Sequence, residues 1–257
     1  GAVASEEGLR RAGGPEGGFQ TLLVSSARGP GLIADARIAA VTLTGSVEAG
    51  RKVAAEAGRH LKKTVLELGG SDPFIVMPTA DLVRAATIAV QARVINNGQS
   101  CIAAKRFILH RQIAEAFTAL FVERMRNLKV GDPMAPDTDV GPLATADGLS
   151  TLESQVDQTV QHGGRLLLGG KRLVGPGYFY LPTVLDGVPP GSPAAVDELF
   201  GPVASLFTVE NLEAALALAN ATRFGLGACI WTNDLSEREQ FVERVESGLA
   251  FVNGMVA

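Results

Sequence analysis

Cysteine is scarce in this sequence, and long apolar runs and blocks of like charge are missing from it. Two cysteines among 257 residues cannot form a disulfide framework, so we expect a reducing compartment. The formal net charge is −4 with the two signs interspersed, which excludes the basic surface of a nucleic-acid-binding protein and a polybasic membrane patch. No run approaches the length of a membrane span, and the first residues lack a signal-peptide pattern. These absences predict a soluble cytoplasmic protein without nucleic-acid or membrane partners.

What the sequence does have is a regular alternation of strand and helix patterns. Short apolar and β-branched runs predict strands at 19–24, 39–45, 64–70, 73–77, 105–110, 165–170, 225–232 and 248–254, and another within 175–185. Helical spacing predicts helices at 46–63, 81–97, 112–128, 148–164, 211–222 and 235–245, and a short one within 29–38. The alternation favours an α/β fold with mainly parallel sheets. Two glycines and a proline interrupt it near residue 70, which predicts a domain boundary there.

The stretch "LTGSVEAG" at 43–50 is a strand-to-helix turn that could hold a phosphate. Gly45 ends the strand and Ser46 is a good helix cap, and the small residue Gly50 would let a ligand approach the backbone. The unpaired N–H groups and positive dipole end of a helix start suit an anion. The spacing is neither the Rossmann nor the Walker pattern, so an ordinary capped turn stays open as the alternative.

The stretch "LELGG" at 66–70 places Glu67 inside an apolar run that we expect to be a buried strand. A buried carboxylate is costly unless it is paired or functional. Desolvation would raise its pKa toward that of a general base. The alternative is a glutamate on the polar face of a half-exposed strand.

Cys101 follows a helix end, a glycine and two polar residues, which is an unusual place for a buried cysteine. Cys229 has apolar, strand-like neighbours and fits the usual role of a small core residue. Lys105 and Arg106 lie close to Cys101 in sequence and would favour its thiolate. The sequence therefore predicts that Cys101, rather than Cys229, is a nucleophile.

Histidine is the base that a cysteine hydrolase would need, and the sequence has three. His60 and His162 fall at expected helix ends. His110 ends the strand after Cys101, too far along an extended chain for direct contact. No local signature supports a cysteine–histidine hydrolase, which stays possible only through tertiary contacts.

A further stretch, "DELFGPV" at 197–203, matches no standard secondary-structure pattern. Glu198 could accept hydrogen bonds from a ribose, and Phe200 could pack against a flat ring. The alternative is a loop anchored by a buried phenylalanine.

Taken together, these stretches resemble the aldehyde dehydrogenase superfamily. "LTGSVEAG", "LELGG", "NNGQSC", "ELFGPV", "GLGACIWTND" and "FVNG" occur in the family's order and near its spacing, from about Pro15 onward. "TVLELGGSDPFIVM" and "GQSCIAAKRFILH" look most like its succinate-semialdehyde dehydrogenase branch.

The resemblance implies NAD(P)-dependent oxidation of an aldehyde to the acid, with succinate semialdehyde as a candidate substrate. Cys101 would form a thiohemiacetal and then a thioester, its backbone N–H would be half of the oxyanion hole, and Glu67 would activate the hydrolytic water. The family also implies a homo-oligomer when full length, and no metal site.

The resemblance implies further residues for the cofactor, NAD or NADP. Ser46 would contact the pyrophosphate, and Glu198 and Phe200 would hold the nicotinamide ribose and ring. The remaining cofactor-binding positions are Gly45, Gly50 and Leu68.

Members of the family are roughly twice this long, so we expect a chain truncated at both ends. Residues 1–70 would be the C-terminal half of the NAD(P)-binding domain, and 71–257 the catalytic domain without its C-terminal end. The other oxyanion donor lies in the family's N-terminal segment, so we expect the chain alone to be inactive. A catalytically silent fragment acting as a binding module stays open as the alternative function. A CoA-acylating enzyme stays open as well, although such enzymes tend to lack a residue like Glu67.

Overall fold

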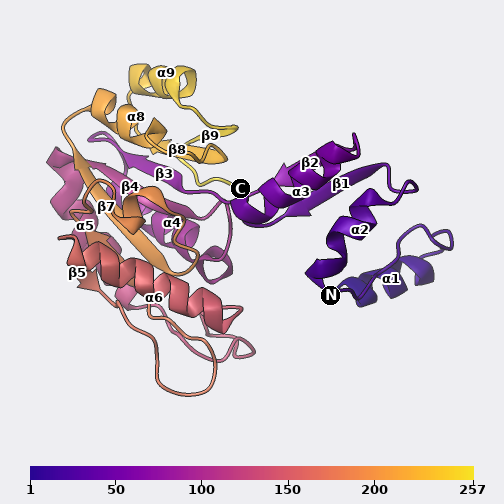
Figure 1. Ribbon diagram of the computed structural model, residues 1–257. Coiled ribbons are helices and arrows are strands. Elements are labelled where there is room, and N and C mark those ends of the chain that lie inside the picture. Colours follow the sequence, from indigo (N-terminus) through magenta and orange to yellow (C-terminus); the bar gives the residue numbers. More distant parts are fainter. The chain divides into compact units, whose positions relative to one another are not determined.

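The computed structural model describes residues 1–257, which form two compact units, Gly1–Leu68 and Gly69–Ala257 (Figure 1). The division falls after Leu68, next to the boundary expected near residue 70. No helix in either unit is long and apolar enough to cross a bilayer. Each unit has its own sheet.

The first unit is built around one β–α–β element. Its elements are α1 (Ala2–Arg11), the 3₁₀ turn η1 (Ser26–Arg28), α2 (Gly29–Ala34), β1 (Ala40–Thr44), α3 (Val47–Arg59) and β2 (Lys63–Glu67). Strands β1 and β2 pair in parallel, from Ala40 opposite Lys63 to Thr44 opposite Glu67. As predicted, Ser46 caps α3: its hydroxyl accepts a hydrogen bond from the backbone N–H of Ala49 at 3.2 Å.

Two predictions for this unit are wrong. No strand forms at 19–24, where Leu23 is 86% exposed and no neighbouring strand supplies a partner. The predicted strand at 64–70 forms as β2, but it is not buried, since its residues are exposed apart from a half-buried Leu66. An apolar run predicts extended backbone, whereas burial depends on what packs over the strand.

The second unit contains a seven-stranded sheet with helices on both faces. Its strands are β3 (Asp72–Val76), β4 (Ala104–His110), β5 (Arg165–Leu168), β6 (Thr183–Asp186), β7 (Val203–Val209), β8 (Gly227–Trp231) and β9 (Leu249–Val252). Its helices are α4 (Leu82–Val94), the 3₁₀ turn η2 (Ile95–Gly98), α5 (Arg111–Arg126), α6 (Ala146–Gln161), α7 (Pro193–Val196), α8 (Leu212–Asn220) and α9 (Leu235–Arg244).

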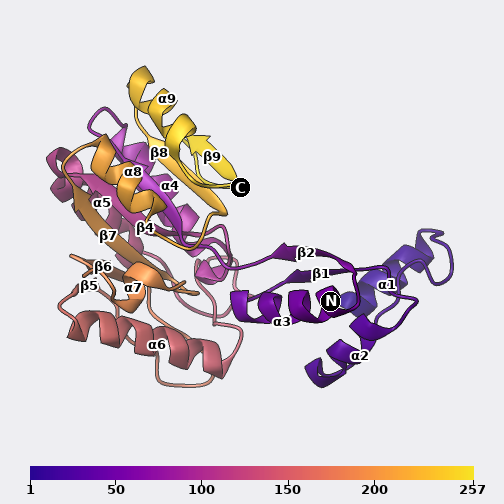
Figure 2. The same ribbon diagram turned by 45° about the horizontal axis from the view of Figure 1, so that its top comes forward.

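The strand order is β5-β6-β7-β4-β3-β8-β9, and every neighbouring pair is parallel except β5 with β6. Helices α4 and α5 cover one face, and α8 and α9 cover part of the other, where they pack on β3, β4 and β8 (Figure 2). The predicted α/β class with mainly parallel strands is confirmed. Strand β7 was not predicted, although it lies beside β4 near the centre of the sheet.

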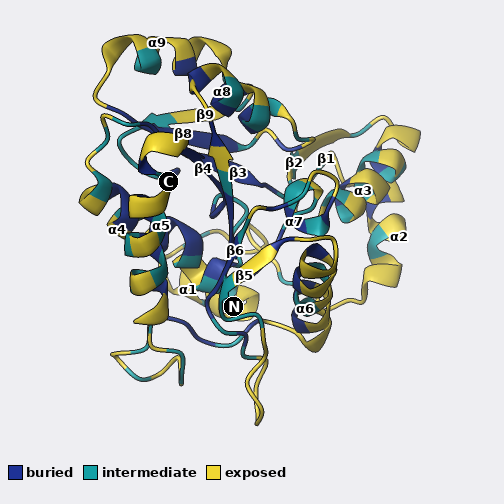
Figure 3. Ribbon diagram, turned by 90° about the vertical axis from the view of Figure 1, so that its left-hand side faces the viewer, coloured by how far each residue is buried: buried dark blue, intermediate teal, exposed yellow.

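The core of the second unit lies along its central strands. All five residues of β3 and all seven of β4 are buried (Figure 3). Phe107 on β4 is fully buried, and its ring centroid lies 5.4 Å from that of Phe74 and 4.8 Å from that of Phe121. This rigid centre carries the loop with Cys101, because β4 begins three residues after that cysteine.

Candidate active site

A sharp backbone turn delivers the chain from α4 to Cys101. Asn96, Asn97 and Gly98 have φ values of 49°, 58° and 74°, all in the left-handed region. Asparagine tolerates this region better than most residues, and glycine enters it freely. A Cβ atom at position 98 would overlap the carbonyl of Gly201. Glycine is therefore required here by both conformation and space.

Side chains from the turn fasten it to a neighbouring loop. The Asn97 carbonyl oxygen Oδ1 accepts a hydrogen bond from the N–H of Gly141 at 2.7 Å, and Gln99 Oε1 accepts one from Ala144 at 3.0 Å. Asn96 Nδ2 donates to the carbonyl of Gln99 at 3.0 Å. Two hydrogen bonds thus tie the turn to the 141–144 loop and one closes the turn on itself, which preorganises the cysteine that follows it.

Cys101 is a partly buried free thiol whose backbone is held by a lysine. The ammonium of Lys105 donates to the carbonyls of Ser100 and Cys101, each at 2.8 Å. Only 2% of the Lys105 side chain is exposed. Charge-assisted hydrogen bonds of this kind are stronger than neutral ones, so the buried Lys105 ammonium holds the backbone of the loop in place.

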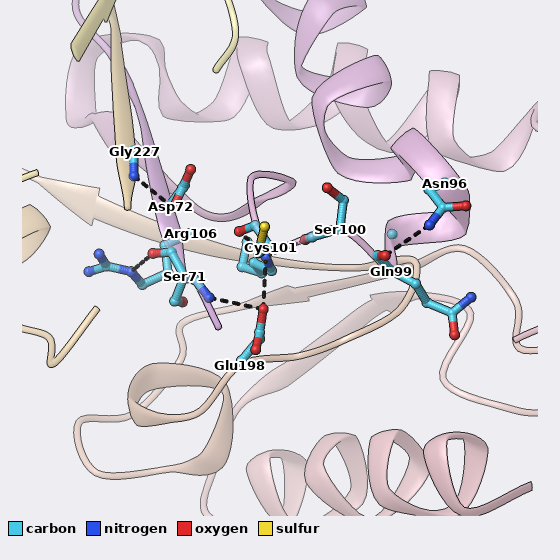
Figure 4. Close-up of polar contacts among 12 residues, drawn as sticks. Ser71, Asp72, Asn96, Gln99, Ser100, Cys101, Arg106, Glu198 and Gly227 are labelled. Atoms are coloured by element: carbon cyan, nitrogen blue, oxygen red, sulfur yellow. Dashed lines mark hydrogen bonds and ion pairs between the residues drawn. The ribbon is translucent and has the colours of Figure 1, made fainter. Parts of the chain in front are cut away.

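Glu198 lies against the same loop (Figure 4). Its Oε1 accepts a hydrogen bond from the N–H of Gly70 at 3.0 Å and lies 3.4 Å from the Lys105 ammonium. A Cβ at Gly69 would overlap the other carboxylate oxygen, and one at Gly70 would overlap the Cys101 carbonyl. The two glycines predicted as a strand end therefore let the backbone pass between Glu198 and Cys101.

Phe200, two residues after Glu198, is 43% exposed. It is not the buried anchor of the alternative interpretation, and its ring is free to meet a ligand. The buried apolar residue of this stretch is Leu199 instead, which is 1% exposed.

A cluster of buried charges surrounds these contacts. Burial raises the pKa of Asp72, which the nearby Lys105 opposes. Burial also lowers the pKa of Lys105, and Glu198 and Asp72 oppose that change. Arg93 is fully buried, donates to the carbonyl of Gly98 at 2.7 Å, and has its pKa lowered by burial to about 9. Asp72 and Arg93 were not singled out in the sequence; the signal for both was a charge within an apolar pattern.

Arg106 does not contact the Cys101 loop, although it was grouped with Lys105 in the sequence. Successive residues of a strand point to opposite faces, and its guanidinium donates to the carbonyls of Ser71, Leu218 and Ala219 at 2.8–2.9 Å. Lys105 is therefore the nearer cationic partner of the cysteine loop.

Cys229 and the three histidines lie elsewhere in the fold. Cys229 is 1% exposed on β8, and burial raises the pKa of its thiol. His110 Nδ1 accepts from the N–H of Gln112 at the start of α5, and His60 and His162 end α3 and α6. No group of three or more candidate ligand side chains is placed to hold a metal.

The first unit gathers the remaining predicted residues at one end of its β–α–β element. The N–H of Gly45 donates to the carbonyl of Glu67 at 2.9 Å, which joins the ends of the two strands. Gly50 packs against Leu68, since a Cβ there would overlap the leucine methyl groups. The Glu67 side chain is exposed and makes no hydrogen bond or ion pair. Ser46 occupies the N–H of Ala49, which leaves the N–H groups of Val47 and Glu48 at the start of α3 for a ligand.

Comparisons with known proteins agree on one family. The model of the aldehyde dehydrogenase family matches residues 2–257. Over 247 residues, 96% of its length, the chain is 55% identical to the succinate-semialdehyde dehydrogenase (NADP(+)) of Mycolicibacterium paratuberculosis and covers 52% of that protein. It is 53% identical to succinate-semialdehyde dehydrogenase (NADP(+)) 1 of Mycobacterium tuberculosis and covers 54% of it.

Solved structures give the same result. The crystal structure of succinic semialdehyde dehydrogenase from Streptococcus pyogenes with NADP+ matches 100% of this chain and 56% of its own, at a TM-score of 0.96 and 34% identity. The crystal structure of the NAD-dependent aldehyde dehydrogenase from Sinorhizobium meliloti matches 99% of this chain and 51% of its own, at a TM-score of 0.96 and 34% identity. The chain spans about half the length of these relatives.

Proposed function

The chain belongs to the aldehyde dehydrogenase family, and from that membership we propose that it contributes the catalytic cysteine to NAD(P)-dependent oxidation of an aldehyde. The observation that carries the proposal is the loop of Cys101. A partly buried thiol follows a strained turn and is held by the buried ammonium of Lys105, with Glu198 alongside. Such preorganisation suits a nucleophile rather than a core cysteine.

The chemistry proceeds in two stages at this thiol. The Cys101 thiolate adds to the aldehyde carbon, and the carbonyl electrons move to the oxygen to give a thiohemiacetal. A bound nicotinamide would supply the acceptor for the hydride of that carbon, and the hydroxyl proton would be lost with it. Water then attacks the resulting thioester, releases the acid and restores the thiol. We assign activation of this water to Glu67, whose carboxylate is exposed and unpaired.

The residues proposed for the cofactor fit its chemistry within each unit. The start of α3, with Ser46 and Gly50, offers N–H groups to a pyrophosphate. One Glu198 oxygen makes no hydrogen bond and could accept one from a ribose hydroxyl, and the exposed Phe200 ring could pack on the nicotinamide. Gly45 and Leu68 complete the pyrophosphate turn.

Succinate semialdehyde is the substrate we propose, with NADP as the preferred cofactor. The support is that relatives at 53–55% identity are NADP(+)-dependent succinate-semialdehyde dehydrogenases. We further propose a cytoplasmic homo-oligomer. In the isolated chain, exposed apolar side chains of the first unit, such as Leu23 and Val65, favour association. Light scattering of the purified protein would measure its oligomeric state, and a monomer at micromolar concentration would contradict this part.

The test of the nucleophile compares the two cysteines in the longest natural form of the protein. Cys101→Ser should lower NADP reduction with succinate semialdehyde by about 10³-fold or more, since a hydroxyl without an adjacent base is a weak nucleophile. Cys229→Ser is the matched control and should leave turnover unchanged, because Cys229 is a buried β8 residue. Mass spectrometry after mild alkylation should find the label on Cys101. Full activity in the Cys101→Ser protein would reject the proposal.

The test of the base separates hydride transfer from hydrolysis. Glu67→Gln should preserve a rapid burst of NADPH while slowing steady turnover by about 10²–10⁴-fold, the usual worth of general-base help. Stopped-flow absorbance resolves the two phases. If turnover is unchanged, Glu67 is not the base.

A further inference from the structure

Lys105 is attached to one particular peptide group of the active-site loop. Its ammonium donates to the carbonyl oxygen of Ser100 at 2.8 Å, and that carbonyl shares its peptide plane with the N–H of Cys101. Peptide groups are planar and trans here, since the structure contains no cis bond. The Cys101 N–H must therefore point away from Lys105, to the opposite side of the peptide.

A second bond from the same ammonium fixes the rotation of this peptide. Lys105 also donates to the carbonyl of Cys101 at 2.8 Å, so one cation holds two successive carbonyls. Arg93 holds the carbonyl of Gly98 in the same way, at 2.7 Å. Both cations are buried, so their bonds are not weakened by competing water.

We propose that Lys105 is a positioning residue that orients and polarises the Ser100–Cys101 peptide, so that the Cys101 N–H becomes a stronger donor to the oxyanion. The inference rests on the proposed function, because it presumes that Cys101 is the nucleophile. When the thiolate adds to a carbonyl carbon, the C–S bond forms and the carbonyl π electrons become a negative charge on oxygen. A hydrogen bond to one end of a peptide group strengthens the donor at its other end, and stronger preorganised donors stabilise that charge.

The charges around Lys105 keep it suited to this task. Glu198 lies 3.4 Å from its ammonium, and both Glu198 and Asp72 favour its protonated form against the effect of burial. Arg93 disfavours that form. A lysine that served only to fill space would not need two carbonyl acceptors and a carboxylate, because a methionine of similar length would fill it without the cost of a buried charge.

The experiment measures the oxyanion directly and without cofactor. A trifluoromethyl ketone of the substrate's size has no hydrogen on its carbonyl carbon, so it forms an adduct with the thiol but cannot lose a hydride. Fluorine NMR across a pH series reports the pKa of the adduct hydroxyl. In the Lys105→Met protein we expect that pKa to be higher by about one unit than in the unsubstituted protein, which is tenfold weaker stabilisation.

The controls separate positioning from simple loss of a buried charge. Arg106→Met removes the next buried cation on β4, which bonds other carbonyls, and should leave the adduct pKa unchanged. Lys105→Gln keeps a neutral donor in place if the methionine variant does not fold, and should raise the pKa by a smaller amount. An adduct pKa unchanged by either folded Lys105 variant overturns this inference alone. Failure of the unsubstituted protein to form any adduct at Cys101 overturns the proposed function as well.

Discussion

The two parallel strand pairs β1–β2 and β3–β4 are similar in length but differ in surroundings. In β1–β2 no residue is buried, whereas every residue of β3 and β4 is. Both arise from the same kind of apolar, β-branched sequence. The comparison shows that such a run determines the backbone conformation, while layers of helix on both sides determine whether the strand becomes core.

The same contrast holds for charge. In the first unit, Lys52 and Glu48 form an ion pair at 2.7 Å with both side chains about three-quarters exposed, so water and salt screen the attraction between the two charges. In the second, Lys105 and Glu198 pair with 2% and 19% of their side chains exposed. Removing one member of a buried pair leaves the other uncompensated, so the chemistry of the second unit depends on charges that its fold must hold together.

The largest effect is expected from truncating one strand residue in each unit. Phe107→Ala should lower the free energy of unfolding by about 3–5 kcal/mol, because the fully buried ring leaves a cavity between Phe74 and Phe121. Val65→Ala, at a β2 residue 61% exposed, should change it by less than about 0.5 kcal/mol. Urea unfolding followed by circular dichroism measures both. Losses of equal size would show that the strands of the two units are equally buried in solution.

How far the fold could be predicted depended on whether a feature is local. The cap Ser46 was predicted because a side chain that caps a helix acts within three residues. The strand at 19–24 was wrong because it has no partner. Strand β7 was missed because its run directly follows Pro202 in a stretch that matches no standard secondary-structure pattern.

The candidate site was predictable where a residue was out of place in its local pattern. Cys101 after a glycine and Glu67 in an apolar run were both singled out this way, and their roles stay predictions; the expected burial of Glu67 is wrong, since it is exposed. The direction of the Lys105 side chain could not be predicted, because it depends on which face of β4 meets the loop. Asp72 and Arg93 were missed because a charge beside an apolar segment is usually solvated, and only the assembled sheet buries them.

A smaller effect should come from the buried carboxylate of Asp72. Its folded pKa is raised by burial, against the influence of Lys105, the Gly227 N–H and Arg106. The folded state therefore retains a proton that the unfolded chain loses near pH 4, and the Asp72 contribution to stability falls as pH rises toward the folded pKa. The free energy of unfolding of Asp72→Asn, relative to that of the unsubstituted chain, should therefore rise by on the order of 1 kcal/mol from pH 5 to pH 8.

Urea unfolding at the two pH values measures this gain. The asparagine can still accept the hydrogen bond from Gly227 that Asp72 accepts at 3.3 Å. The control is Asp157→Asn, which makes the same substitution at an exposed residue of α6. If the difference in free energy of unfolding between the two proteins is the same at pH 5 and pH 8, Asp72 titrates as it does in the unfolded chain.

The smallest expected effect concerns two glycines of one helix in the first unit, where packing is thin and local preference should decide stability. Gly58 lies in α3 with open space around the position of a Cβ, so Gly58→Ala should stabilise the helix by about 0.5 kcal/mol through its higher helix propensity. Gly50→Ala, in the same helix, adds the same methyl group where it overlaps Leu68, and should destabilise instead. Hydrogen exchange of the α3 amides reports the local opening free energy for both variants. Opposite signs would show that even this exposed unit has one tightly packed point, at the end of the proposed pyrophosphate turn. Stabilisation by both substitutions would mean that Leu68 moves freely and that Gly50 is needed only for the ligand.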